Sequence, residues 1–281
     1  MNIRHMQSSD LDFAAGCAKD VGWTSTTRGA FETSLAYDPN GCFIAEVDGR
    51  TIGLCIATNY GQSGFVGDLI VIEDMRGRGI GHRMLEHATN YLRSCGTQSI
   101  FLDGVPSAIS LYERAGFRKV CRSLRFAGRI RGQSHPCVRA IQTKDLEAVS
   151  EIDRKAFGAD RRFFLERCWS LYPELCKIMD RDGEVLGFIM GRRGGDVVSV
   201  GPWVVTGDAE RPGDLLEGLA AEVGDLNLTM GILETNSVAV ATVRSLGLPE
   251  RREPSWRMVL GSSSDLGSSG WSYAIGSPAK G

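Results

Sequence analysis

A strand, a glycine-rich turn and a helix follow one another without interruption between Gly67 and Cys95. The run from Leu69 to Ile72 is apolar throughout, as in a strand that is covered on both faces. After glycines at 77, 79 and 81, apolar residues recur with helical spacing up to Leu92, and Gly96 stands where a helix commonly ends. This succession is typical of an α/β protein in which a tight turn opens a helix.

The turn has the chemistry of an anion site. Glycines let the backbone approach a ligand closely, and the first amides of a helix have no partner within the helix. The helix dipole adds partial positive charge at the same place. Arg76 and Arg78 add two full charges that suit phosphate oxygens. A pyrophosphate is therefore the expected ligand, against the alternative of a glycine-rich connection that binds nothing.

Two known phosphate-binding loops are excluded by their spacing. The chain has no GxxxxGK[ST] sequence, and it has no GxGxxG followed by an acidic residue about 20 positions later. The turn instead reads R-x-x-G-x-G from Arg76 to Gly81, and LYERAGF follows at Leu111–Phe117. Together with the preceding strand, these motifs resemble the GNAT N-acetyltransferase superfamily, in which the turn holds the pyrophosphate of acetyl-CoA.

The resemblance implies a set of site residues. Acetyl-CoA is the implied cosubstrate, and no metal is implied. Main-chain amides beside the thioester would come from the strand, and those beside the pyrophosphate from the turn; the implied cofactor-binding residues are Leu69, Ile70, Val71, Arg76, Gly77, Arg78, Gly79, Ile80 and Gly81. The asparagine that often precedes the family's tyrosine by seven residues is Val105 here, so its contact is missing or is made by Ser107.

Tyr112 matches the tyrosine that commonly protonates the CoA sulfur in this family. Its ordinary pKa near 10 keeps the phenol protonated at neutral pH, as an acid must be. The alternative is a core tyrosine on a short amphipathic helix. For the base we place Asp68 first, acting through water, Asp103 second and Glu73 third. Each of these carboxylates could instead be a cap or an exposed charge, and some family members use no dedicated base.

Length and composition limit the class of protein. A chain of 281 residues accommodates two domains, and its formal net charge of −2 gives no support for nucleic-acid binding. No stretch is long and apolar enough to cross a membrane, and no signal segment opens the chain, so we expect a cytoplasmic protein. The eight cysteines include no CxxC pair, and the four histidines show no metal-binding spacing.

The chain also repeats itself. IRHMQSSDLD, which starts at Ile3, matches VRAIQTKDLE, which starts at Val138, and an equivalent order of helices and strands follows each. We therefore predict an α/β (α+β) fold with two tandem GNAT-like domains, each a mixed, mostly antiparallel twisted sheet flanked by helices. The expected segments are a catalytic domain at 1–128, a linker at 129–136, a second domain at 137–260 and a Gly/Ser-rich tail at 261–281.

The second copy departs from the family at its phosphate turn. TGDAERPGDLL replaces the glycine–arginine sequence, and Asp208, Glu210 and Asp214 would repel a pyrophosphate. Val243 holds the position of the tyrosine. This copy is interpreted as degenerate: it has lost cofactor binding and either shapes the acceptor pocket or is a structural partner. The tail composition favours a flexible segment, although Trp271 and Tyr273 could dock it.

The predicted function is acetyl transfer from acetyl-CoA to a primary amine by direct attack in a ternary complex. A small-molecule amine is favoured as the partner, because a second folded copy can enclose a pocket. The alternative acceptor is a protein or peptide amine. A hypothesis of another class is a regulatory or scaffold protein that binds CoA without turnover. Neither a nucleic acid nor a membrane is expected as a partner.

Overall fold

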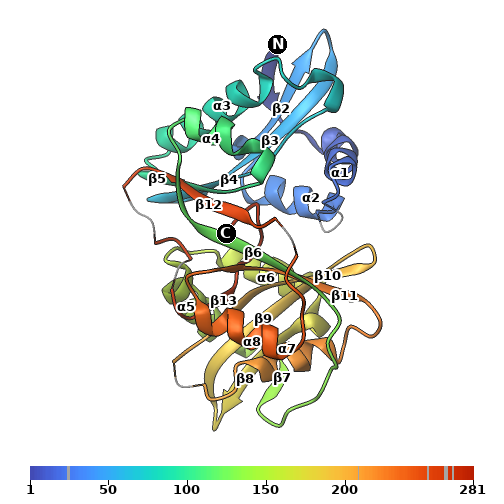
Figure 1. Ribbon diagram of the computed structural model, residues 1–281, viewed down its shortest axis with the longest axis vertical. Coiled ribbons are helices and arrows are strands. Elements are labelled where there is room, and N and C mark those ends of the chain that lie inside the picture. Colours follow the sequence, from blue (N-terminus) through green and yellow to red (C-terminus); the bar gives the residue numbers. More distant parts are fainter. Residues whose placement is uncertain (24–25, 208, 252, 263–264, 268) are drawn as a thin grey trace. The chain divides into compact units, whose positions relative to one another are not determined.

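The computed structural model describes residues 1–281 except 24, 25, 208, 252, 263, 264 and 268. Its contacts divide the chain into two compact units, drawn in Figure 1. Unit 1 comprises Met1–Val120, Trp256–Ser264 and Pro278–Gly281. Unit 2 comprises Cys121–Ser255 and Asp265–Ser277. Each unit is an α/β fold with a mixed, mostly antiparallel sheet, as the sequence predicts.

The sheet of unit 1 is antiparallel except at one pair of strands. Its order is β1 (Asn2–His5), β2 (Cys42–Val47), β3 (Arg50–Tyr60), β4 (Ser63–Val71), β5 (Ser99–Gly104) and β12 (Ser255–Leu260). The β2–β3 hairpin turns at Asp48 and Gly49, which have φ values of 50° and 78°, so Asp-Gly provides the left-handed turn that a tight hairpin needs. Strands β4 and β5 are parallel neighbours.

Helices cover both faces of this sheet (Figure 1). One face carries α1 (Leu11–Asp20) and α2 (Arg28–Tyr37), which enclose a core around Phe31. The other face carries α3 (Ile80–Ser94) and α4 (Ile109–Arg114). Short 3-10 helices lie at Ser8–Asp10, Pro39–Gly41, Glu73–Met75 and Pro106–Ala108. This packing explains the helical spacing of apolar residues between 80 and 92, because Ile80, Met84 and Leu92 form the buried face of α3.

Strands β4 and β5 pair for only three residues each and then part. The pairing runs from Ser63–Phe65 on β4 to Ser99–Phe101 on β5, while β4 continues to Val71 and β5 to Gly104. Backbone amides along the parted segment of β4 are therefore not committed to β5. The parted segment of β4 leads in sequence to the turn that begins α3.

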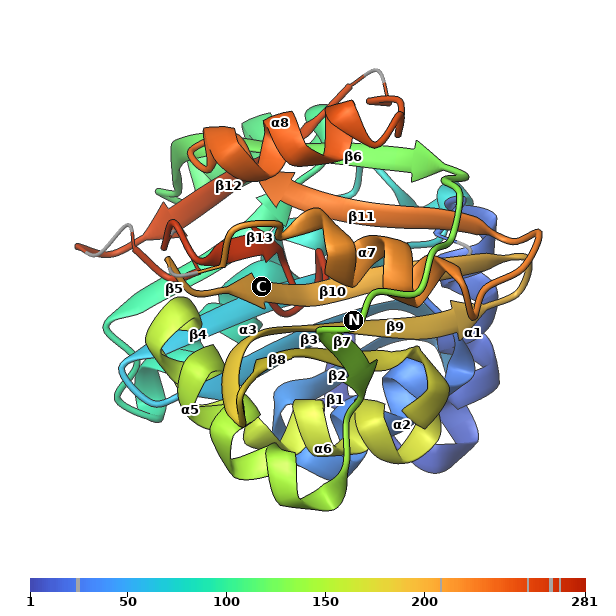
Figure 2. The ribbon, with the colours of Figure 1, turned by 90° about the horizontal axis from the view of Figure 1, so that it is seen from below.

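Unit 2 repeats this plan with its own strands and helices (Figure 2). Its sheet order is β6 (Arg118–Gly128), β11 (Asn227–Leu233), β10 (Val197–Val205), β9 (Glu184–Gly194), β8 (Cys176–Arg181) and β7 (Val138–Ala140). Its helices are α5 (Leu146–Phe157), α6 (Arg162–Leu171), α7 (Gly213–Ala220) and α8 (Ser237–Ser245), with 3-10 helices at Thr143–Asp145 and Pro173–Leu175. Within the described part of the chain, none of the helices has the length and apolarity needed to cross a bilayer.

An ion pair occurs at the same place in both halves and accounts for the sequence repeat. Arg4 donates to both carboxylate oxygens of Asp10 at 2.7 and 2.8 Å, and the amide of Gln7 donates to Asp10 at 2.8 Å. Arg139 and Asp145 form the matching pair at 2.7 and 3.0 Å. The arginine holds the pKa of each aspartate below its ordinary value. The residues shared by the two halves thus form the same ion pair, which joins the first strand of each half to the start of its first helix.

Each half contributes its closing strand to the other unit. Strand β6, encoded in the first half, pairs with β11 of unit 2, whereas Trp256–Leu260 of β12 pairs with β5 of unit 1. The sequence places both strands correctly along the chain but assigns each to the half that encodes it. Alternating apolar residues fit either partner strand equally well, so the pattern alone does not identify the partner.

The tail differs from the flexible segment that its composition favours. Residues Ser272–Ala274 form β13, which pairs antiparallel with β10. The Tyr273 ring lies 5.1 Å from that of Trp203, centroid to centroid, and Tyr273 is buried. The docking alternative for Tyr273 therefore holds. Three residues of strand are too short to stand out in a Gly/Ser-rich stretch.

Candidate functional site

The turn before α3 has the backbone geometry that its glycines suggest. Gly77 and Gly79 both have φ = 76°, in the left-handed region, and Gly79 is the N-cap of α3. The first backbone hydrogen bond of the helix runs from the Arg83 amide to the Gly79 carbonyl at 3.2 Å. The amides of Ile80, Gly81 and His82 precede this bond and are available to an anion.

Both arginines of the turn are exposed and are held by main-chain carbonyls. Arg76 Nε donates to the carbonyl of Val71 at 2.9 Å, and Arg78 Nη2 donates to that of Asp74 at 3.2 Å. The bond from Arg76 ties the turn to the end of β4. Positive charge and free amides thereby lie together near the end of β4. This arrangement suits the pyrophosphate of an acyl-CoA.

The start of α3, the end of β4 and helix α4 meet around Gly81. A Cβ at this position would lie 3.6 Å from Leu111 Cδ2 and 3.9 Å from Val71 Cγ2. Val71 belongs to the predicted thioester segment and Leu111 precedes Tyr112. The structure therefore brings the predicted turn, the thioester strand and the helix that carries Tyr112 into one region.

Tyr112 is nearly buried within this region. Its ring packs on Gly104, where an added Cβ would lie 2.9 Å from Tyr112 Cδ2, and it stands edge-on to Phe117 at 6.2 Å. Burial, and to a smaller extent Cys55, raises the pKa of its phenol above the ordinary value. The phenol therefore keeps its proton through neutral pH. Ser107 lies exposed in the short helix Pro106–Ala108.

Asp68 lies where β4 bulges. The register of β4 against β3 shifts between the pairs Leu54–Ile70 and Ile56–Gly67, and Asp68 has φ = 48°. Its side chain is buried, at 5% exposure. Burial raises the pKa of its carboxyl, and the charge of Lys280 opposes that rise. Asp68 is thus a carboxyl with a raised pKa on the strand that borders the gap.

The two lower-ranked carboxylates have other surroundings. Asp103 accepts a hydrogen bond from Arg257 Nε at 2.6 Å, and both side chains are sequestered from solvent, at 0% and 1% exposure. Asp103 is therefore committed to an ion pair between β5 and β12. Glu73 is exposed in the short helix Glu73–Met75.

Sequence reasoning missed a tail segment at this site. The backbone of Ala279 lies directly on Gly67 of β4, so that a Cβ on Gly67 would collide with the Ala279 carbonyl. The hydroxyl of Tyr60 donates to the carbonyl of Lys280 at 2.9 Å. The tail lies more than 200 residues from β4 in sequence and has no motif, so no local signal reveals this contact.

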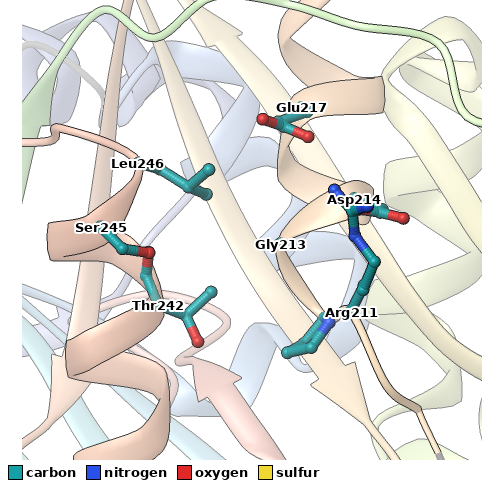
Figure 3. Close-up of a pocket in the computed structure, with 8 residues that line it drawn as sticks. Arg211, Gly213, Asp214, Glu217, Thr242, Ser245 and Leu246 are labelled. Carbon is teal, nitrogen blue, oxygen red and sulfur yellow. The ribbon is translucent and has the colours of Figure 1, made fainter.

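The equivalent region of unit 2 is acidic (Figure 3). A pocket of about 170 Å³ lies between the start of α7 and helix α8. Figure 3 shows Thr242, Ser245 and Leu246 on one side and Arg211, Asp214 and Glu217 on the other. Arg211 Nε lies 3.1 Å from Asp214 Oδ1, so its charge is already paired. The start of α7 therefore presents one arginine and two carboxylates where α3 presents two arginines.

One cluster of metal-ligating side chains occurs among the described residues, and the histidine spacing gave no sign of it. It consists of His135, Asp214 and Glu217, whose ligand atoms lie within 4.8 Å of one another. His135 Nε2 is 2.7 Å from Glu217 Oε2, and Nδ1 is 3.5 Å from Asp214 Oδ2. Each ring nitrogen thus faces a different carboxylate. This arrangement ties the segment around His135 to α7, whereas a metal site directs one ring nitrogen and both carboxylates at a common point.

Comparison with known families identifies both halves. The profile of the acetyltransferase (GNAT) family matches residues 9–117, and that of a GNAT acetyltransferase domain matches residues 149–273. The chain therefore belongs to the GNAT acyltransferases and carries two GNAT domains in tandem. The resemblance inferred from the turn and from Leu111–Phe117 is confirmed. A GNAT domain uses an acyl-CoA cosubstrate, which fits the amides and arginines around Gly79.

Known proteins resemble the chain at low identity. Holothin acyltransferase of a Pseudoalteromonas species is 25% identical over 178 residues, 62% of this chain and 59% of that protein. An uncharacterised N-acetyltransferase of Methanocaldococcus jannaschii is 38% identical over 55 residues, 19% of this chain and 35% of that protein. The chain thus spans less than two thirds of the length of either relative.

Solved structures share the fold over the whole chain. A Pyrococcus horikoshii protein described as an acetyltransferase has a TM-score of 0.83 at 24% identity, covering 100% of this chain and 95% of its own. A tandem GNAT protein from the clavulanic acid biosynthesis pathway has a TM-score of 0.63 at 14% identity, covering 94% and 99%. These likenesses establish the fold.

The turn generates a direct test. We expect Gly79→Glu to weaken acetyl-CoA binding by at least about 100-fold, which is about 2.8 kcal/mol at 1.4 kcal/mol per tenfold, because a carboxylate would face the pyrophosphate. Gly79→Asn is the control, since asparagine tolerates the left-handed backbone and carries no charge. Calorimetric titration with acetyl-CoA measures both. Equal affinity of the two variants would contradict a phosphate site at this turn.

Proposed function

We propose that unit 1 transfers an acetyl group from acetyl-CoA to the primary amine of a small molecule, by direct attack in a ternary complex. The observation that carries this proposal is the parting of β4 from β5 next to a turn with free amides and two arginines. The turn would hold the pyrophosphate, with Ser107 as a further cofactor contact. The gap would admit the thioester, with amides from Leu69–Val71 as donors to the carbonyl oxygen.

The proposed chemistry gives Asp68 and Tyr112 separate tasks. Asp68 would accept a proton from the ammonium of the acceptor, through water, which leaves a neutral amine for attack. Its raised pKa brings it closer to neutrality, where a base is most effective. Tyr112 would donate its proton to the departing sulfur, and its raised pKa keeps that proton in place until then. A small-molecule acceptor is favoured by the likeness to a holothin acyltransferase.

Unit 2 is proposed to bind no acyl-CoA. Its strands β10 and β11 pair only over Val197–Val200 and then part, as β4 and β5 do. Strand β13 of the tail enters this gap: the Val205 amide donates to Trp271 and the Ile275 amide donates to Gly231, both at 2.9 Å. The chain itself thus uses the backbone groups that a pantetheine arm would need. Asp214 and Glu217 at the start of α7 are unfavourable to a pyrophosphate.

The proposed proton donor is tested with Tyr112→Phe. Free thiol release from acetyl-CoA is first followed with a panel of amino acids, amino sugars, polyamines and short peptides, and the fastest acceptor is kept. We expect the variant to bind acetyl-CoA as the wild type does but to transfer acetyl about 100-fold more slowly, because the sulfur must leave without its acid. Phe117→Leu, which alters a ring neighbour of Tyr112 but no proton, is the control. Unchanged transfer by Tyr112→Phe would remove Tyr112 from the mechanism.

The panel also separates the alternative functions. Release with short peptides and not with small amines would favour a protein or peptide acceptor. If the chain binds acetyl-CoA but releases no free thiol with any amine of the panel, the proposed specificity is contradicted. A CoA-binding regulatory protein is then favoured.

The proposed base is tested through pH. Because the pKa of Asp68 is raised in the folded protein, its protonated form stabilises the fold below the unfolded pKa, and that stability is lost as pH rises through the folded pKa. We expect Asp68→Asn to lose less stability than the wild type between pH 4 and 7, roughly the range above an ordinary aspartate pKa. We also expect transfer to fall about 100-fold. Chemical denaturation at several pH values measures the first effect, and initial rates of transfer measure the second. If Asp68→Asn changes the pH dependence of stability but keeps the wild-type rate of transfer, Asp68 is a structural residue.

A further inference from the structure

The tail segment Pro278–Gly281 belongs to unit 1 and lies against strand β4. Gly67 has no side chain, and the backbone of Ala279 occupies the space where a Cβ would stand. Tyr60, at the end of β3, fixes the next residue through the 2.9 Å bond from its hydroxyl to the Lys280 carbonyl. Two independent contacts therefore place Lys280 beside the bulge at Asp68.

The same relation occurs in unit 2, which shows that the contact is built into the fold. Gly201 of β10 stands at the position of Gly67 in β4, and a Cβ there would collide with the carbonyl of Ile275. Pro202 stands at the position of Asp68, so the second unit lacks the carboxyl. Both strands thus use a glycine to admit the backbone of the tail, but only unit 1 places an acidic residue next to that glycine.

The charge of Lys280 acts on groups beside the bulge at Asp68. Burial raises the pKa of the Cys42 thiol to about 12, and the charge of Lys280 opposes that rise, as it does at Asp68. Cys42 belongs to the core packed under α1 and α2, whereas α3 covers the opposite face (Figure 1). The backbone contacts of residues 279 and 280 therefore hold Lys280 beside the bulge, where its charge reaches Asp68.

We propose that Lys280 is an acetyl acceptor of the chain's own active site, so that the protein carries an intramolecular N-acetylation site. The inference rests on the proposed function of unit 1. Backbone contacts of residues 279 and 280 hold this primary amine next to the bulge of β4 that carries the proposed base, on the strand that would bind the thioester. The substrate class of the site is thus a primary alkylammonium, which Lys280 itself supplies.

The step balances without a further reactant. The Lys280 ammonium gives one proton to Asp68, which passes it to solvent, and the neutral Nζ attacks the thioester carbonyl carbon. An N–C bond forms and the C–S bond breaks. The nitrogen loses a second proton, and the sulfur leaves as the free thiol of CoA with a proton from Tyr112, which is restored from that second proton. The products are acetyl-lysine, CoA and one proton released to solvent.

The test is mass spectrometry of the full chain incubated with acetyl-CoA and no added acceptor. We expect one acetyl group per chain, and peptide mapping to place it on Lys280 at least about tenfold faster than on Lys144, since an amine held at the site reacts with a high effective concentration. Lys144 is exposed and reports the uncatalysed background. Lys280→Arg is expected to remove the single acetyl group, because arginine keeps its proton. Gly79→Glu is expected to reduce the modification of Lys280 to the level of Lys144.

The outcomes separate this inference from the function on which it rests. Transfer to added amines with Lys280 unmodified, or modified no faster than Lys144, overturns the acceptor role of Lys280 and leaves the proposed function standing. Modification of Lys280 that is equally fast in Gly79→Glu also overturns it, because the reaction would not use the site. Absence of acetyl-CoA binding by the wild type overturns both.

Discussion

The parting of two parallel strands is the constraint on which both units depend. A parallel pair satisfies its backbone groups by regular hydrogen bonding, and when the strands separate those groups need another partner. In unit 2 the tail strand β13 supplies the partner with main-chain bonds to Val205 and Gly231. In unit 1 the parted segment of β4 leads instead to the turn at Gly77–Gly81. The two units thus share the parted strands, and the proposed function assigns only the gap of unit 1 to acyl-CoA.

The charges at the start of α3 and at the start of α7 also distinguish the two units. At the start of α3, the helix dipole is joined by Arg76 and Arg78, and all three attract phosphate. At the start of α7, Asp214 and Glu217 cancel the dipole and Arg211, and they bind His135 instead. The start of α3 is the proposed cofactor site, whereas the start of α7 fastens the segment around His135.

Much of this architecture is readable from local sequence. The strand, turn and helix around Gly79 carry their own signals in apolar spacing and glycines, and the repeat at Arg4 and Arg139 encodes a local ion pair. What the sequence does not reveal depends on contacts between distant residues. The exchange of β6 and β12, the entry of β13 into its gap, the pairing of Asp103 with Arg257 and the contact of Ala279 with Gly67 all join segments more than 65 residues apart. No periodicity or motif specifies such partners.

Hydrogen–deuterium exchange of the main-chain amides with and without acetyl-CoA tests the account most directly, because it reports which helix start receives the cofactor. The account predicts slower exchange at residues 76–83, where amides at the start of α3 would donate to the pyrophosphate, and no change at residues 211–220 in the equivalent part of unit 2. Protection at 211–220, or binding of acetyl-CoA that leaves 76–83 unchanged, would contradict it.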